Sequence, residues 1–181
     1  MDFSQLHLDT PRMKLVPISE DHASDIAEHF TAEITRYMWP SAPKTRQEIV
    51  DHVQLKQLAM RKSKEIALIL IRKDRSEFLG YASLHEIQSR SPELGIWLKK
   101  SAQGHYYGYE ALSALIEWTA ANLHYDYLKY PVDKSNYPSR KLIEKLGGTP
   151  QDEYVKCSES GRVLHELEYR IYRAPLASEL Q

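Results

Sequence analysis

The residues whose types and spacing point most clearly to a ligand site lie in the stretch QGHYYG at residues 103 to 108. This stretch runs directly into a helical pattern of apolar residues. The chain contains only seven glycines, and two of them, Gly104 and Gly108, fall here. Glycine lets a backbone turn sharply and approach a ligand, and the first turn of a helix presents unpaired N–H groups that favour anions. The stretch therefore predicts a site for a phosphorylated ligand, with a plain strand-to-helix turn as the alternative.

Other kinds of chemistry have no matching motif in the sequence. The eight histidines are scattered without HExxH spacing, and no CxxC pair is present, so we expect no metal site. GxSxG and GxxxxGK[ST] are also absent, which argues against a serine hydrolase and a P-loop enzyme.

Composition and charge indicate an ordinary globular chain. Its 181 residues are 42% hydrophobic and 27% charged, and we expect one domain over residues 1–181. A net charge of −1 argues against stable binding to nucleic acid or to an anionic membrane. The start resembles no signal peptide, and no apolar run approaches the roughly 18 residues of a membrane span.

Cys157 is the only cysteine, so an intrachain disulfide is excluded. This favours a reducing compartment, and we expect a cytoplasmic protein. No setting that would lower a thiol pKa is visible nearby, so we expect Cys157 to be a semi-buried small side chain instead of a reactive thiol.

Hydrophobic periodicity divides the chain into strands and helices. Strand patterns occupy residues 12–18, 66–71, 78–87, 93–99, 126–133, 153–160 and 163–173. Helical patterns occupy residues 19–30, a segment from about Thr45, a segment from the glycine stretch to about Asn122, and residues 136–148. The apolar face of the second helix is assigned to Ile49, Val53, Leu55, Leu58 and Met60.

The order of these elements predicts how the strands pair. Three consecutive strands between residues 66 and 99 are joined by short turns, which indicates an antiparallel meander. The segment from residue 93 to residue 132 reads strand, helix, strand. We therefore expect strands 93–98 and 126–132 to be parallel, with the helix packed on one face.

This succession, with QGHYYG before one helix and Asn-x-x-Ser at Asn136 and Ser139 opening the next, resembles the GNAT family of acyl-CoA-dependent N-acetyltransferases, in particular its RimJ/RimL-like branch. The resemblance covers nearly the whole chain and includes EITRYM at 33–38, ELGIWL at 93–98 and NYPSRKLIEKLGG at 136–148. It implies an α/β fold of the α+β type. The expected sheet is mixed but mostly antiparallel, with about seven strands, a splayed parallel pair and helices on both faces.

The resemblance also implies acetyl-CoA as cofactor, with coenzyme A as product. The family's loop has the form Gln/Arg-x-x-Gly-x-Gly/Ala and holds the pyrophosphate. Gln103 and Gly108 match its ends, whereas Tyr106 replaces the usual glycine, and its N–H stays available if its φ is negative. We expect the chain to bend at Gly104 and Gly108, and the diphosphate to contact Gln103, Gly104, His105, Tyr106, Gly108 and Tyr109.

In the family, the pantetheine arm lies between the splayed strands, which assigns it the backbone groups of Ile96, Trp97 and Leu98. The indole of Trp97 is expected in the core. Asn136 and Ser139 match polar residues that contact pantetheine, and capping of the last helix by Asn136 is compatible with that role.

Acetyl transfer to a primary amine needs a neutral amine and a place for the developing oxyanion. Glu93 is our candidate base, and a solvated strand-end carboxylate is the alternative. Glu86 and His85 are substitutes, of which only one should reach the cleft, since neighbours on a strand point to opposite faces. A backbone N–H near Ile96 or Trp97 is the candidate for the oxyanion.

The departing thiolate needs a proton, and Ser139 is the preferred donor, with Tyr137 in reserve. The acceptor should enter beside the loop at residues 37–44, where Tyr37 and Trp39 are candidate substrate contacts or ordinary packing.

We expect the acceptor to be an N-terminal α-amine of a ribosomal or other protein, or a small-molecule amine, and the sequence does not choose between them. Two other readings remain open: a non-catalytic acyl-CoA-binding module, and a scaffold without cofactor. We expect a monomer or a homodimer.

Overall fold

The computed structural model describes residues 2–173, which form one eight-stranded sheet in the order β1-β2-β3-β4-β5-β6-β8-β7. The strands are β1 (Leu8–Asp9), β2 (Met13–Pro17), β3 (Ile66–Arg72), β4 (Glu77–His85), β5 (Glu93–Leu98), β6 (Tyr127–Asp133), β7 (Thr149–Cys157) and β8 (Val163–Tyr172). The seven expected strands are confirmed, and β1 adds a two-residue strand at one edge.

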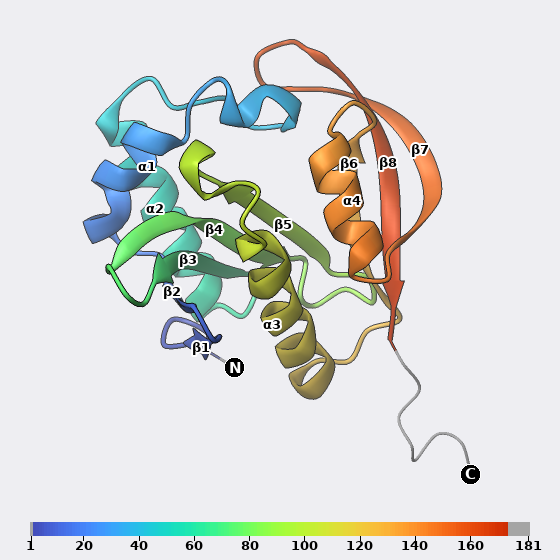
Figure 1. Cartoon of the computed structure of the whole chain (residues 1–181), viewed down its shortest axis with the longest axis horizontal. Helices are drawn as coiled ribbons and strands as arrows, with labels where there is room; N and C mark the ends of the chain where they lie inside the picture. Colours follow the sequence, from blue (N-terminus) through green and yellow to red (C-terminus); the bar gives the residue numbers. More distant parts are fainter. Residues whose placement is uncertain (1, 174–181) are drawn as a thin grey trace.

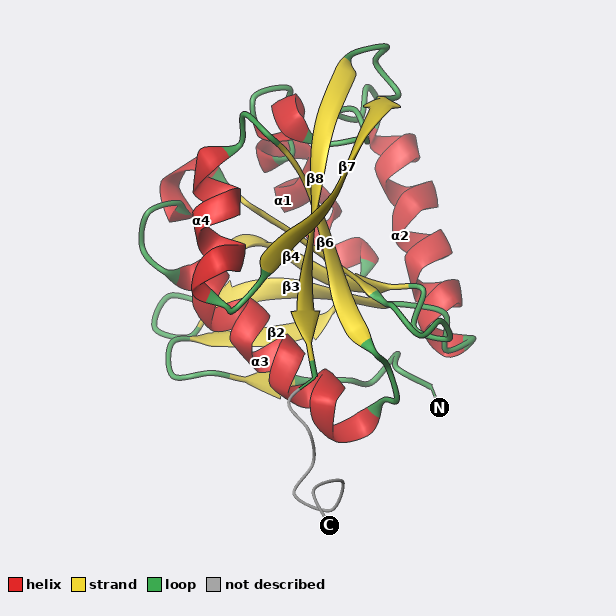
Figure 2. Cartoon of the chain, turned by 90° about the vertical axis from the view of Figure 1, so that its right-hand side faces the viewer, coloured by secondary structure: helices red, strands yellow, loops and turns green. Residues whose placement is uncertain are grey.

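Four α-helices cover both faces of the sheet (Figures 1 and 2). They are α1 (Ala23–His29), α2 (Arg46–Arg61), α3 (Tyr107–Asn122) and α4 (Tyr137–Lys145), with 3-10 turns at Glu20–His22, Ile34–Tyr37 and Lys100–Ala102. The first two helices lie on one face, and α3 and α4 lie on the other. Buried apolar residues from the sheet and from both helix layers form a hydrophobic cluster between them. The predicted α/β fold is therefore confirmed.

The N-terminus of α2 follows from its cap. The Thr45 hydroxyl accepts a hydrogen bond from the Glu48 N–H at 3.2 Å, which satisfies one of the free donors of the first turn. Ile49, Val53 and Met60 are buried, as expected. Leu55 and Leu58 contradict the prediction, since they are 62% and 44% exposed. At 3.6 residues per turn, they lie off the stripe that the other three share.

The meander β3-β4-β5 is antiparallel, as predicted. Register pairs Ser83 with Gly95 and His85 with Glu93. Because side chains alternate along a strand and directly paired residues share a face, these four residues face the same side of the sheet.

The parallel pair β5–β6 is splayed, and Pro131 explains why. Only Glu93 and Lys129 are in register, and the Lys129 N–H donates to the Pro92 carbonyl at 2.8 Å. Two residues further on, the N–H of β6 would again face β5, but Pro131 has no N–H. The two strands diverge from this point, while β6 stays paired with β8 from Tyr127 to Asp133.

The last helix and hairpin also follow local rules. Asn136 caps α4, with its side chain accepting from the Ser139 N–H at 3.3 Å, and Gly147 follows the helix at φ +87°. Strands β7 and β8 are antiparallel, with Gly161 in their turn at φ +81°. Cys157 is exposed, contrary to the semi-buried prediction, because it belongs to the edge strand β7.

Membrane spans and metal sites were searched for within residues 2–173. No helix in this range is long and apolar enough to cross a membrane. The same residues contain no group of three or more His, Cys, Asp or Glu side chains arranged to hold a metal ion.

Candidate active site

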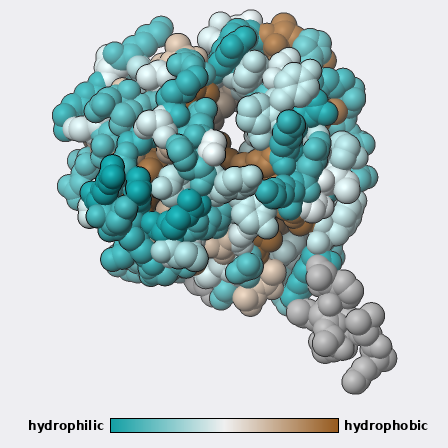
Figure 3. Space-filling view, in the orientation of Figure 1, coloured by the Kyte–Doolittle hydropathy of each residue, from teal (hydrophilic) through white to brown (hydrophobic). Residues whose placement is uncertain are grey.

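A cavity of about 760 Å³ opens where β5 and β6 diverge. Figure 3 shows a hollow in the surface beside α4, with hydrophobic side chains visible inside it. The predicted site residues that line the cavity are Tyr37, Trp39, His85, Glu93, Ile96, Trp97, Asn136 and Ser139. Leu98 and residues 103–109 lie outside its lining. The structure thus brings together the predicted catalytic, pantetheine and acceptor residues and leaves the predicted phosphate loop beside them.

Glu93 begins β5 and is half-buried in the cavity wall. Burial raises the pKa of Glu93, and the charges of Lys156 and Lys129 oppose that shift only in part. A carboxylate with a raised pKa is a better proton acceptor than a solvated one. This environment favours Glu93 as base over the solvated strand-end alternative.

His85 also faces the cavity, at the centre of a hydrogen-bond chain. Its Nε2 lies 2.9 Å from Ser83 Oγ, and its Nδ1 lies 2.8 Å from Glu65 Oε2. Burial alone would raise the pKa of Glu65, but the His85 hydrogen bond and the Lys56 ammonium lower it. Glu65 therefore stays ionised and favours the His85 tautomer with hydrogen on Nδ1.

Glu86 lies outside the cavity lining, as the alternation of side chains predicts for one of this pair. It follows β4 with φ +53°, and its carboxylate accepts from Lys129 Nζ at 2.9 Å.

Sequence reasoning missed Glu166, Lys156, Ser83 and Tyr130, which all line the cavity. Glu166 is 5% exposed, and its Oε2 lies 3.3 Å from Lys156 Nζ. Ser83 and Tyr130 lie on β4 and β6, the two neighbours of β5. Glu166 and Lys156 lie on β8 and β7, which follow β6 in the sheet, and only this strand order brings them to the cavity. A charged residue at an inward position of a predicted strand, as Glu166 is between Leu164 and Leu167, was the available signal.

The loop before α3 adopts the predicted turn in part. Gly104 has φ +80°, a conformation that favours glycine. Tyr106 has φ +63°, so the condition that its φ be negative is not met. Gly108 does not bend the chain, contrary to prediction, because it lies inside the first turn of α3. A Cβ there would lie 3.3 Å from Leu142 Cδ2 and 3.5 Å from Leu98 Cδ1, so its small size serves close packing instead.

The side chains of this loop lie at the surface. Gln103 donates from Nε2 to the Leu98 carbonyl at 3.1 Å, which ties the loop to the end of β5. Tyr106 and Tyr109 are 65% and 36% exposed. The Lys145 ammonium from α4 lies 4.4 Å from the Tyr106 ring centroid, which places a positive charge beside the first turn of α3.

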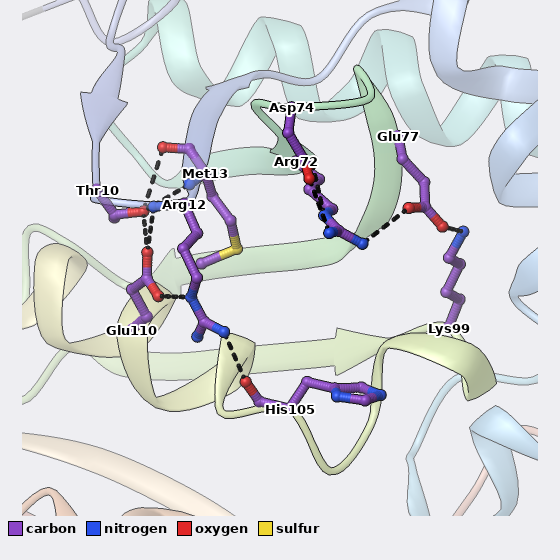
Figure 4. Close-up of polar contacts among 9 residues, drawn as sticks. All are labelled: Thr10, Arg12, Met13, Arg72, Asp74, Glu77, Lys99, His105 and Glu110. Atoms are coloured by element: carbon purple, nitrogen blue, oxygen red, sulfur yellow. Dashed lines mark hydrogen bonds and ion pairs between the residues drawn. The ribbon is translucent and has the colours of Figure 1, made fainter.

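The turn between β1 and β2, which contains Thr10 and Arg12, is hydrogen-bonded to the loop and to the first turn of α3 (Figure 4). Arg12 donates from Nη1 to the His105 carbonyl at 3.0 Å and from Nε to Glu110 Oε2 at 2.7 Å. The other carboxylate oxygen of Glu110 accepts from the Thr10 hydroxyl at 2.6 Å and from the Arg12 N–H at 2.8 Å. Arg12 also lies over the Tyr107 ring, 4.4 Å from its centroid. These contacts fix the start of α3 relative to the sheet.

Ser139 and Asn136 lie where α4 meets the gap between β5 and β6. The Ser139 Oγ is 2.6 Å from the hydroxyl of Tyr130, a buried residue of β6. Tyr137, the reserve donor, is 64% exposed and does not line the cavity. Its position argues against that role.

Strand β5 presents its free edge to the cavity beyond Glu93. Trp97 is buried, as predicted for its indole, with its ring centroid 4.7 Å from that of Phe30 and 5.7 Å from that of Phe78. The backbone of Ile96 is left beside the gap, whereas Trp97 pairs with Tyr81 of β4 and the Leu98 carbonyl already accepts from Gln103.

The segment with Tyr37 and Trp39 borders the cavity and is tied to the β7–β8 turn. The Trp39 carbonyl accepts from the Glu159 N–H at 3.0 Å, and the Arg162 guanidinium donates to the carbonyls of Arg36 at 2.6 Å and Thr35 at 2.8 Å. Trp39 itself is 49% exposed at the cavity mouth.

Comparison with solved structures shows that this fold is shared with several acetyltransferases. RimL, a ribosomal L7/L12 alpha-N-protein acetyltransferase in complex with coenzyme A, matches with a TM-score of 0.82 and 18% identity, covering 92% of this chain and 98% of that one. An acetyltransferase from Salmonella typhimurium that modifies the N-terminal serine of ribosomal protein L7/L12 matches with a TM-score of 0.80 and 16% identity, covering 92% and 99%.

The microcin C7 self-immunity acetyltransferase MccE, in complex with acetyl-CoA and AMP, gives a TM-score of 0.78 at 16% identity, covering 90% of this chain and 93% of that one. Among curated proteins, none matched the chain significantly. The family model described as an acetyltransferase (GNAT) domain matches residues 12–149, well over half of the chain. The chain therefore belongs to the GNAT acetyltransferases, enzymes that transfer an acetyl group from acetyl-CoA.

Proposed function

We propose that this enzyme acetylates a primary amine in the manner of the RimJ/RimL-like branch, with the N-terminal α-amine of a ribosomal or other protein as acceptor. The observation that supports this most strongly is the position of Glu93, a half-buried carboxylate at the point where β5 and β6 separate. Two structural neighbours named as modifying ribosomal protein L7/L12 support the choice of acceptor.

In this proposal, the pantetheine arm lies in the gap and pairs with the free backbone edge of β5 around Ile96, as an added strand would. The diphosphate lies against residues 103–109, beside the first turn of α3. Lys145 adds a positive charge to that side of the loop.

Glu93 takes a proton from the acceptor amine, directly or through water, and the amine nitrogen attacks the thioester carbonyl carbon. The oxyanion that forms accepts a hydrogen bond from a backbone N–H near Ile96 or Trp97. When the C–S bond breaks, the Ser139 hydroxyl donates a hydrogen bond to the departing sulfur. An α-amine, with an ordinary pKa of about 8, reaches its neutral form with less help than a lysine amine, with a pKa of about 10.4.

In this proposal the cavity mouth receives an extended peptide end. Tyr37 and Trp39 border it on one side, and Leu55 of α2 adds an exposed apolar side chain to its lining. The second candidate acceptor is a small-molecule amine, which the volume of about 760 Å³ would also admit.

The test is an acceptor comparison with acetyl-CoA as donor. One peptide has a free N-terminus and no lysine, a second is N-terminally blocked and contains one lysine, and small primary amines form the third group. The proposal predicts coenzyme A release with the first peptide and little with the second. Turnover restricted to small amines would overturn the peptide acceptor and leave the acetyltransferase activity in place.

The cytoplasmic location, the single domain over residues 1–181, and the monomer or homodimer remain predictions. Gel filtration with light scattering tests the last of these.

A further inference from the structure

Tyr130 contacts Ser139 but is not part of the Asn-x-x-Ser motif that identified Ser139. Tyr130 lies on β6, next to Lys129, whose pairing with Glu93 is the last before the strands separate. Its hydroxyl is 2.6 Å from Ser139 Oγ, and both residues line the cavity. Tyr130 is only 4% exposed, so this contact is made away from bulk water.

The surroundings indicate which oxygen donates. Burial raises the pKa of Tyr130 to about 12, so its phenol keeps its proton at neutral pH. The phenol of a buried tyrosine needs an acceptor, and Ser139 Oγ is the acceptor that lies within reach. If Tyr130 donates, the hydrogen of the Ser139 hydroxyl is left free for another acceptor. The Asn136 side chain is already engaged by the Ser139 backbone N–H.

We propose that Tyr130 is a positioning residue that turns the Ser139 hydroxyl hydrogen toward the thioester sulfur and so stabilises the departing thiolate. This rests on the proposed function, which places the thioester in the gap between β5 and β6. In this proposal Tyr130 makes no bond to the reacting atoms and acts through Ser139.

The amine nitrogen forms a bond to the carbonyl carbon, and its proton goes to Glu93 or to water. The C–S bond then breaks, and its electron pair goes to sulfur. Ser139 donates a hydrogen bond to the resulting thiolate, while Tyr130 and Ser139 keep their own protons. The thiolate takes a proton from solvent, since an ordinary thiol has a pKa near 8.5.

The test uses Tyr130→Phe, Ser139→Ala and the double variant of the full chain. Tyr169→Phe is the matched control, because Tyr169 is also a fully buried tyrosine that contacts α4, donating to Glu144 Oε1 at 2.6 Å, but lies outside the cavity lining. Turnover is measured with acetyl-CoA and with its selenoester analogue, because a selenolate leaves with less stabilisation than a thiolate.

We expect Tyr130→Phe to lower kcat with acetyl-CoA by about 10-fold to 100-fold, because Ser139 without its partner no longer directs its hydrogen bond to the developing charge, and this is the range for losing such a bond. KM for acetyl-CoA should change little, and the loss with the selenoester should be smaller. The double variant should be no slower than Ser139→Ala alone, because both changes remove one unit. Tyr169→Phe should match the unmodified enzyme in kcat.

A second readout needs no acceptor amine. Coenzyme A and desulfo-coenzyme A are titrated calorimetrically at a pH above the thiol pKa. The unmodified protein should prefer coenzyme A, and Tyr130→Phe should reduce that preference. A kcat within about twofold of the unmodified enzyme, equal losses with both esters, or an unchanged preference would overturn the proposal. Failure of the proposed function would appear differently, as absence of peptide turnover by the unmodified protein.

Discussion

Two glycines give a matched test of the proposed phosphate loop. Gly104 and Gly161 have φ +80° and +81°, and a Cβ built on either meets no atom within 4 Å. Substitution by alanine therefore costs only the left-handed conformation, about 1–2 kcal/mol, partly offset because alanine restricts the unfolded chain by about 0.4–1 kcal/mol. We expect each variant to lose about 1 kcal/mol of unfolding free energy, a fall in Tm of roughly 2–4 °C for a chain of this size.

The two variants should differ in acetyl-CoA binding. Gly104 lies in the loop before α3, whereas Gly161 lies in the β7–β8 turn. If Gly104→Ala depopulates the binding-competent loop by about 1 kcal/mol, the apparent Kd rises up to about fivefold. Thermal denaturation and calorimetric titration measure both quantities. The reasoning fails if Gly161→Ala weakens binding as much, or if Gly104→Ala lowers Tm and leaves Kd unchanged.

Three further predictions concern residues around the cavity. Glu93→Gln should lower kcat/KM by about 10²-fold to 10⁴-fold near neutral pH. The same substitution should raise Tm near neutral pH, because burial raises the pKa of Glu93 and the folded state disfavours its ionised form. This gain in Tm should shrink as pH falls through the Glu93 pKa, and a gain that is constant across pH would refute the explanation. Arg12→Gln should weaken acetyl-CoA binding, because it releases the His105 carbonyl. Arg90→Gln is the control and should not weaken it, because the Arg90 side chain is 84% exposed. Equal acetyl-CoA affinities of the two variants in calorimetric titration would contradict a role for Arg12 in holding the loop. Gly108→Leu should cost about 1–3 kcal/mol of stability, because its side chain would overlap Leu142 and β5, and an unchanged Tm would count against that packing.

The order of the elements was predictable because each periodic pattern is local. Strand alternation and the cap at Asn136 need only neighbouring residues, and the structure has that cap. The βαβ rule extended this to the parallel β5–β6 pair. Pro131 could also have located the gap from sequence alone, since proline in a central strand removes a ladder hydrogen bond.

The composition of the cavity wall was less predictable, because it depends on strands distant in sequence. Lys156 and Glu166 reach the cavity only because β8 lies between β6 and β7, an order that no local pattern encodes. The role of Gly108 was misassigned for the same reason. Its neighbours Leu98 and Leu142 lie on β5 and α4, and a motif that matches the last glycine of a phosphate loop does not show them.

Two backbone features open and shape the same cavity. Pro131 deprives β6 of the N–H that would continue pairing with β5, so the gap exists before any ligand enters it. Gly95 shapes the adjoining wall, since a Cβ there would lie 2.6 Å from Ser83 Oγ and 3.5 Å from His85 Nε2. One feature removes a hydrogen bond and the other removes a side chain. Both leave space beside Glu93, so this half-buried carboxylate borders an open cavity instead of being enclosed in the protein interior.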